Sequence, residues 1–206
     1  MREITPVVKQ LLIINILFFV GTQILQDKAY MYFALFPFNN PNFQIWQLLT
    51  HMFMHGGIMH IAFNMFALYS FGSMLESIWG NKKFLFFYIS CGLGAGIMQN
   101  LINLYTGDIM TSAVGASGAI YGLLVAFAFM FPDAQLAMMF IPVPIKAKYF
   151  VPGILAIDLF LGIKGNSIFG GSGTGIAHFA HIGGALIGFI MMWYWKKNSF
   201  NNRRWN

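Results

Sequence analysis

The chain has 206 residues, of which 58% are hydrophobic and 9% charged, and its formal net charge is +6. Soluble domains carry about 25% charged residues, and a soluble protein of this length needs more polar side chains to cover its surface. The composition therefore excludes an ordinary soluble domain and indicates a lipid-facing surface. The basic residues flank apolar segments, which favours membrane orientation over nucleic-acid binding. The single cysteine, Cys91, excludes an intramolecular disulfide, and its apolar surroundings favour a packing role.

Long segments without Asp, Glu, Lys or Arg divide the chain into candidate membrane helices, each of which needs about 20 mostly apolar residues. We predict an all-α, polytopic membrane helix bundle formed by a single domain over residues 1–206. Its six transmembrane helices are expected at residues 8–26, 52–75, 83–105, 115–132, 147–164 and 176–195. The first apolar run lacks a small-residue cleavage site behind it, which predicts a retained helix and not a removed signal peptide.

Three connections between these helices have a distinct composition. Residues 27–51 are rich in aromatic residues, which is typical of the membrane interface. Pro142 and Pro144 argue against helix between residues 132 and 147. The glycine-rich segment 165–175 is expected to be a flexible connector. Together with helix 147–164, it is the part that we expect to move when a substrate enters.

The distribution of basic residues predicts the orientation of the bundle. With six helices and the N-terminus inside, the inner segments hold ten Lys and Arg residues and the outer segments hold two, Lys28 and Lys164. The inner ten are Arg2, Lys9, Lys82, Lys83, Lys146, Lys148, Lys196, Lys197, Arg203 and Arg204. An excess of basic residues inside is the rule for membrane proteins, so both termini are expected in the cytoplasm.

All five histidines then lie at one depth, near the outer starts of three helices. The polar residues grouped there are His51, His55, His60 and Asn64, then Ser117, then His178 and His181. Ionisable residues inside a membrane are costly and usually mark a functional site. The alternative is that the histidines are unrelated and each forms a hydrogen bond with a neighbouring carbonyl. Their shared depth would then be a coincidence.

Ser117 is a candidate nucleophile because of the residues around it, in the sequence GASGAIYG. The small residues Gly115 and Gly118 allow a substrate backbone to come close. Free N–H groups at the start of a helix favour an oxyanion beside the serine. The motif is G-x-S-G and not the G-x-S-x-G of soluble hydrolases. The alternative is a serine that only helps two helices to pack.

His181 is the candidate base for this serine. Gly184 and Gly188 follow it at GxxxG spacing, and Gly118 and Gly122 form a second such face behind Ser117. Helix faces formed by small residues let two membrane helices approach closely. Contact between these two faces would bring His181 within roughly 3 Å of Ser117, the distance at which a base can take the proton of a nucleophile. Two neighbours bear on this choice. His178 competes with His181 but lies one turn nearer the aqueous surface, and Tyr121 follows Ser117 by four residues, where its ring could support the imidazole.

His60 and Asn64 form an i, i+4 pair of suitable oxyanion donors, although Asn64 could instead hydrogen-bond between helices. His51, His55 and His60 suggest a zinc site, but the HExxH motif is absent and no carboxylate lies nearby in sequence, so neither a metal nor a cofactor is expected.

No third catalytic residue is evident. Asp158 is a candidate for orienting a partner, but a polar contact between helices is favoured, which leaves a Ser–His dyad. Three other acids, Asp27, Asp108 and Glu76, are less suitable still.

Three motifs in this order resemble those of the rhomboid proteases of the minimal six-helix prokaryotic type. They are His51-x3-His55-x4-His60-x3-Asn64, GASGAIYG around Ser117, and His181-x2-Gly184-x3-Gly188. The resemblance implies Ser117 as nucleophile and His181 as base and then acid. It also implies an oxyanion hole formed by His60, Asn64 and the Ser117 N–H, with His55 in a supporting position. One departure is Gln47 after Trp46, where the family often has Trp-Arg.

The implied function is an intramembrane serine endopeptidase in the lipid bilayer, expected in a bacterial cytoplasmic membrane. Its partners would be single-span or polytopic membrane-protein substrates, cut near the outer face, and not nucleic acid. Two alternatives belong to other classes. An inactive rhomboid-like protein that binds or escorts membrane proteins predicts loss of Ser117 or His181, and both are present. A metal-handling or transport protein predicts carboxylates at the depth of the histidines, where Asp158 alone qualifies.

Overall fold

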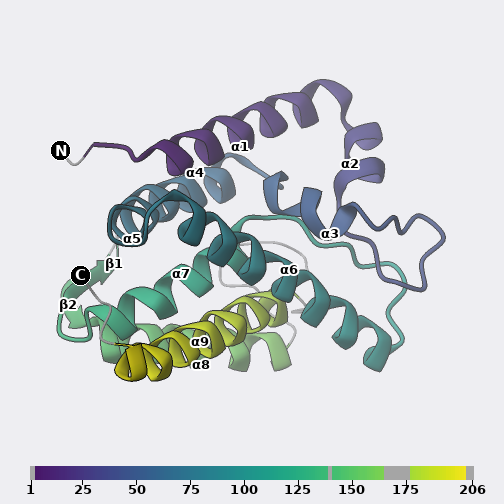
Figure 1. The fold of residues 1–206 in the computed structure, drawn as a ribbon. Coiled ribbons are helices and arrows are strands. Elements are labelled where there is room, and N and C mark those ends of the chain that lie inside the picture. The colour runs from purple at the N-terminus through teal and green to yellow at the C-terminus, as the bar shows by residue number, and fades with distance from the viewer. Residues whose placement is uncertain (1–2, 139–140, 165–176, 203–206) are drawn as a thin grey trace.

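The computed structural model describes residues 3–138, 141–164 and 177–202. The elements in chain order are α1 (Pro6–Leu25), α2 (Asp27–Phe33), α3 (Gln47–Thr50), η1 (His51–Phe53), α4 (Ile58–Ala67), η2 (Leu68–Gly72), α5 (Ser73–Trp79), α6 (Asn81–Thr106), α7 (Ser117–Met130), β1 (Gln135–Met138), β2 (Ile141–Lys146), α8 (Ala147–Lys164) and α9 (Ala177–Asn202). The fold is an all-α bundle in which the long helices run side by side, with α1 beginning and α9 ending at the same end (Figure 1). The predicted connector 165–175 lies outside the described residues.

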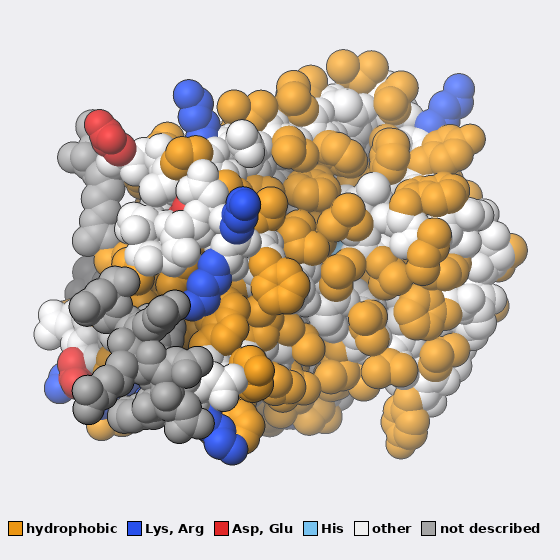
Figure 2. Space-filling model, viewed as in Figure 1, with side chains coloured by type: hydrophobic (Ala, Val, Ile, Leu, Met, Phe, Trp, Pro, Cys, Tyr) orange, Lys and Arg blue, Asp and Glu red, His pale blue; other side chains and the backbone are white. Residues whose placement is uncertain are grey.

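The protein is an integral membrane protein. Within the described ranges, three helices are long and apolar enough to cross a membrane: Pro6–Leu25, the continuous α4–η2–α5 helix Ile58–Trp79, and Asn81–Thr106. The apolar α7 is shorter, with 14 residues, and at 1.5 Å per residue it covers only about 21 Å. Six spans therefore remain a prediction. On the face shown in Figure 2, hydrophobic side chains cover the middle of the bundle, and Lys and Arg gather toward the end that carries β1 and β2.

The core lies where α6, α7 and α9 pack together, with α1 against one side. Its largest fully buried side chains include Phe84, Phe87 and Tyr88 of α6 and Leu123 of α7. Cys91 is buried in the same cluster, next to Gly122 of α7. The residues that face the core thus come from several helices, and they fix the position of the short α7 from all sides.

Two expected helix starts are wrong, and the expected ends at residues 75 and 195 fall short of the observed ends at Trp79 and Asn202. The helix expected from residue 52 begins at Ile58, because His51–Phe53 forms a separate 3₁₀ turn and the chain stays irregular through Gly56 and Gly57. The helix expected from residue 115 begins at Ser117, because Gly115 adopts a φ of +131°, which is incompatible with a right-handed helix. Ser117 is consequently the first residue of its helix.

The segment expected as a loop at 27–51 contains α2 and α3, which lack a long apolar period and were not predicted. Gln47 anchors this segment from a fully buried position. Its Oε1 accepts hydrogen bonds from the N–H groups of Phe36 (3.3 Å) and Gln44 (3.1 Å). Its Nε2 donates to the carbonyls of Met31 (3.2 Å) and Asn42 (3.1 Å). The neutral amide of Gln47 thus makes four contacts at the position where the rhomboid proteases, which the sequence resembles, often have arginine.

At the opposite end of the bundle, β1 and β2 form an antiparallel hairpin between α7 and α8, in register Gln135↔Lys146. No helix forms around Pro142 and Pro144. Lys146 and Lys148 lie 3.2 and 2.9 Å from the carboxylate of Asp133, and these two neighbours hold the pKa of that exposed group below its usual range.

Glu76 of α5 caps the start of α1, where its carboxylate accepts hydrogen bonds from the N–H groups of Val7 and Val8 at 2.8 Å each.

Candidate active site

Ser117 and His181 meet between the start of α7 and the first turns of α9. The Ser117 Oγ lies 2.8 Å from the Nε2 of His181, and both side chains are half-buried. The other ring nitrogen, Nδ1, lies 2.5 Å from a carboxylate oxygen of Asp158, which can only accept. The proton of a neutral His181 therefore sits on Nδ1, which leaves Nε2 as an acceptor for the serine hydroxyl. This is the arrangement that a hydroxyl nucleophile and its base require.

Glycines bring these two side chains together. A Cβ on Gly184 of α9 would overlap the backbone carbonyl of Gly118 in α7. One turn further along, a Cβ on Gly188 would lie 2.8 Å from the Cα of Gly122. The two small faces named in the sequence are therefore in direct backbone contact, and any side chain there would push α7 and α9 apart. The distance between Ser117 and His181 depends on this contact.

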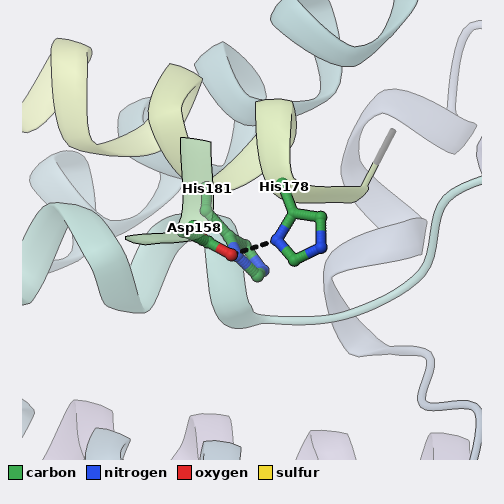
Figure 3. A group of neighbouring side chains, drawn as sticks. All are labelled: Asp158, His178 and His181. Atoms are coloured by element: carbon green, nitrogen blue, oxygen red, sulfur yellow. Dashed lines mark hydrogen bonds and ion pairs between the residues drawn. The ribbon is translucent and has the colours of Figure 1, made fainter. Parts of the chain in front are cut away.

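Asp158 supplies a carboxylate that the favoured dyad did not include. It lies on α8, is 1% exposed, and contacts two imidazoles (Figure 3). Its Oδ2 accepts from Nδ1 of His181, and its Oδ1 accepts from Nδ1 of His178. Asp158, His181 and Ser117 form a continuous hydrogen-bonded chain, so the acid that the sequence offered as a candidate for orienting a partner contacts His181 although the favoured dyad did not include it. The periodicity of the apolar helix 147–164 did not indicate which of its faces points to α9.

The ring of Tyr121, on α7, supports the imidazole of His181. It stacks on the ring of His181 with centroids 4.3 Å apart and an angle of 9° between the planes. The hydroxyl of Tyr121 also interacts with the carboxylate of Asp158. Stacking and hydrogen bonding together leave the imidazole of His181 one orientation.

His60 lies on the other side of Ser117. A Cβ on Gly115 would lie 2.9 Å from both Cε1 and Nε2 of the His60 ring and 3.5 Å from the Oγ of Ser117. Only glycine fits this position, because of the close ring and because of its φ of +131°. The N–H of Gly56 points to Nδ1 of His60 at 3.5 Å. The proton of a neutral His60 then sits on Nε2, the nitrogen next to Gly115.

Asn64, one turn after His60 on α4, is 6% exposed, and its Nδ2 has no hydrogen-bond partner in the described part of the chain. A buried amide without a partner is uncommon and needs an explanation. The N–H of Ser117 is one of the first in α7, which have no partner within a helix. His60 adjoins Gly115, and Asn64, one turn further along α4, carries the amide without a partner in the described ranges. Together with the N–H of Ser117, these are the three donors that the sequence predicts for an oxyanion site.

His51 and His55 precede α4 and play different parts. His55 is buried, and its ring packs edge-on against His60 at 5.0 Å. Burial lowers the pKa of His55 to about 3, so this ring is neutral. His51 lies away from Ser117: its Nδ1 faces the carbonyl of Gln47 at 2.8 Å, and its own carbonyl accepts from the N–H of Gly115 at 2.9 Å. Burial lowers the pKa of His51 to about 4. It fixes the chain before Ser117.

Two further features adjoin the site. One is a cavity of about 220 Å³, lined by Thr22, Gln23, Gln26, Asp27, Tyr30, Met54, His55, Gly56 and Val114. It thus reaches His55 and Gly56, which precede His60 in the chain, and Val114, which precedes Gly115.

The other is a group of possible metal ligands. In the described ranges, the ligand atoms of Asp158, His178 and His181 lie within 4.8 Å of one another, the separation that a metal site needs. Both Nδ1 atoms already face carboxylate oxygens as hydrogen-bond partners, so the group is complete as a hydrogen-bonded cluster.

Comparison with known proteins identifies similar chains. Residues 42–198 match the family model described as the Rhomboid domain. The chain is 33% identical over 161 residues to the presenilin-associated rhomboid-like protein, mitochondrial, of Homo sapiens, covering 76% of this chain and 39% of that protein. It is 30% identical over 158 residues to rhomboid-like protein 11, chloroplastic, of Arabidopsis thaliana (76% and 55%). It is 32% identical over 145 residues to the rhomboid protease GluP of Bacillus subtilis (strain 168) (70% and 25%). The chain thus spans about two fifths of the length of the mitochondrial relative.

Proposed function

Because the chain belongs to the rhomboid family, we propose that it is an intramembrane serine endopeptidase that hydrolyses peptide bonds in or near transmembrane segments of other membrane proteins. The observation that carries this proposal is the 2.8 Å contact between the Oγ of Ser117 and the Nε2 of His181. The relative from Bacillus subtilis, which is named as a protease, supports it.

Ser117 attacks the scissile carbonyl carbon while His181 Nε2 takes the hydroxyl proton. The negative charge then forms on the carbonyl oxygen, where the donors of His60, Asn64 and the Ser117 backbone stabilise it. His181 returns its proton to the leaving amine, and the C–N bond breaks. Water, deprotonated by His181, then attacks the acyl carbon. His181 returns that proton to the Oγ of Ser117 as the C–O bond breaks, and the acyl group leaves as a carboxylic acid. Asp158 stabilises the imidazolium and keeps its orientation, which makes the proposed unit a triad.

The substrate must expose a carbonyl that is normally hydrogen-bonded within its helix. We expect cleavage at segments with glycine or other weak helix formers, because each glycine lowers the cost of unwinding by about 1 kcal/mol. The half-buried side chains of Ser117, His60 and His181 support access of water to this end of the bundle. We propose that this end faces the outer side, with both termini in the cytoplasm of a bacterium. Fractionation of cells that express the tagged protein tests the compartment.

A second candidate is a rhomboid-like protein that binds or escorts membrane proteins without cleaving them. The names of the mitochondrial and chloroplast relatives, which say "rhomboid-like" and not "protease", support this candidate. The complete hydrogen-bonded chain from Asp158 to Ser117 favours the protease, since binding alone does not need a nucleophile aligned with a base.

Cleavage in detergent or liposomes separates the two candidates. The purified protein is incubated with a panel of single-span substrates, beside Ser117→Ala, His181→Ala and the double variant. We expect cleavage by the unaltered protein and none above a few per cent in any variant, with no further loss in the double variant because the two residues act as a unit. Binding of substrates by all four proteins, without cleavage by any, would favour the escort function.

A further inference from the structure

His178 is a buried histidine that the proposed mechanism does not use. It lies on α9 three residues before His181, is 4% exposed, and its Nδ1 forms a hydrogen bond with Oδ1 of Asp158. Residues three apart on a helix lie on one face, so both imidazoles point toward α8 (Figure 3). In sequence, this residue was a competitor for the role of base. The structure directs its Nδ1 to the carboxylate instead.

The two imidazoles divide the carboxylate of Asp158 between them. His178 occupies Oδ1 and His181 occupies Oδ2, with ring centroids 6.2 Å apart and ring planes at 85°. A carboxylate bound through one oxygen can rotate about its Cβ–Cγ bond, whereas one bound through both oxygens cannot. The contact of His178 therefore determines where Oδ2 lies, and Oδ2 determines where Nδ1 of His181 points.

The charge of Asp158 gives the same contact a second consequence. A buried carboxylate is costly unless it is hydrogen-bonded, and charge-assisted hydrogen bonds are the stronger ones. The Nδ1 atoms of His181 and His178 are hydrogen-bond donors to Asp158. Because His181 is itself the residue that Asp158 orients, His178 is the donor that holds the carboxylate independently of it.

We propose that His178 is a positioning residue, which fixes Asp158 so that His181 keeps its proton on Nδ1 and its free nitrogen toward Ser117. This inference rests on the proposed protease function. In metal sites, the hydrogen-bond partners of a ligating histidine contribute about 10–100-fold to affinity or activity, and we expect an effect of this order here. The effect of His178 should therefore be smaller than that of His181, and it should fall on the chemical step and not on substrate binding.

Two substitutions of similar size separate the hydrogen bond from mere packing. His178→Phe keeps a ring but removes the donor, whereas His178→Asn places its Nδ2 where the Nδ1 of histidine was and keeps the donor. We expect His178→Phe to lower kcat by about 10-fold or more with little change in KM. His178→Asn should recover most of the loss, although it fills less of the buried space. Equal kcat values in His178→Phe and the unaltered protein would overturn the proposal, as would a loss in both variants that follows their thermal stability.

A spectroscopic measurement tests the contact without relying on activity. In a Ser117→Ala background with ¹⁵N-labelled histidine, the ring signals of His181 report which nitrogen carries the proton. We expect a protonated Nδ1 when residue 178 is His or Asn, and a changed or mixed signal with Phe. An unchanged His181 signal in Ser117→Ala, His178→Phe would overturn the inference. If the protein cleaves nothing, the protease proposal fails, and this signal still decides whether His178 positions Asp158 and His181.

Discussion

The Oγ of Ser117 and the Nε2 of His181 lie 2.8 Å apart although 64 residues separate them in the chain. Two features produce this contact. The glycine faces of α7 and α9 let the backbones touch, and the carboxylate of Asp158 fixes the far side of the imidazole at 2.5 Å. Each feature leads to a substitution with a specific expected result.

Replacing Asp158 by asparagine should lower kcat strongly while the protein remains folded. The amide can donate to Nδ1 of His181, which favours the wrong tautomer and places the proton on the nitrogen that faces Ser117. The equivalent change in a soluble serine protease costs about 10⁴-fold, and we expect a loss of at least about 10²-fold here, measured as kcat on a single-span substrate.

Asp133→Asn is the matched control for Asp158→Asn, because its exposed ion pairs with Lys146 and Lys148 lie in the hairpin at the opposite end of the bundle. Exposed ion pairs contribute little to stability because solvent screens them, so both folding and activity should be unaffected. Similar kcat values in Asp158→Asn and Asp133→Asn would remove Asp158 from the proposed triad.

The glycine contact predicts a different behaviour for two glycine-to-alanine changes. Gly184→Ala places a methyl group against the carbonyl of Gly118 and should separate α7 from α9, lowering both thermal stability and cleavage. Gly21→Ala in α1 has nothing within 4 Å and should be neutral or stabilising by about 0.5–1 kcal/mol, because alanine is the better helix former. Unfolding temperature and cleavage rate are measured for both variants. Full activity in Gly184→Ala would contradict the close approach of the helices.

Asn64→Ala tests the oxyanion site. Loss of one oxyanion donor costs about 10²–10³-fold in soluble proteases, and a smaller loss is expected here because His60 and the N–H of Ser117 remain. The decrease should fall on kcat, measured over a range of substrate concentrations. An effect confined to KM would assign Asn64 to substrate binding or packing.

The proposed orientation predicts access from one side of the membrane. A cysteine at position 117, in a Cys91→Ala background, should react with a membrane-impermeant thiol reagent added outside sealed vesicles. The exposed ends of α6 provide matched controls, with Tyr105→Cys expected to react from outside and Lys82→Cys from inside. Reaction of position 117 from the inner side alone would reverse the orientation proposed from the Lys and Arg distribution.

Some of these features could be predicted from the sequence, for identifiable reasons. Small residues at four-residue spacing mark the contact between α7 and α9, and this spacing points to Ser117 and His181 without structural information. The importance of Asp158 could not be predicted in the same way. It lies 23 residues from His181, on a helix whose apolar pattern does not indicate which face is buried.

Local backbone geometry accounts for the other differences. The start of α4 at Ile58 depends on a 3₁₀ turn and on two glycines that hydropathy does not distinguish from helix. The short helices α2 and α3 are held by contacts with distant carbonyls, such as those made by Gln47, and not by a period of their own. These contacts exist only in the folded protein.

Covalent labelling of the nucleophile tests the central claim most directly. A fluorophosphonate reacts with a serine only when a base has activated it, and mass spectrometry of the labelled protein identifies the modified residue. The proposed mechanism predicts one adduct, on Ser117, which is lost in both Ser117→Ala and His181→Ala and greatly slowed in Asp158→Asn. An adduct on another serine, or unchanged labelling of Ser117 in His181→Ala, would contradict the claim that these two residues form the catalytic pair.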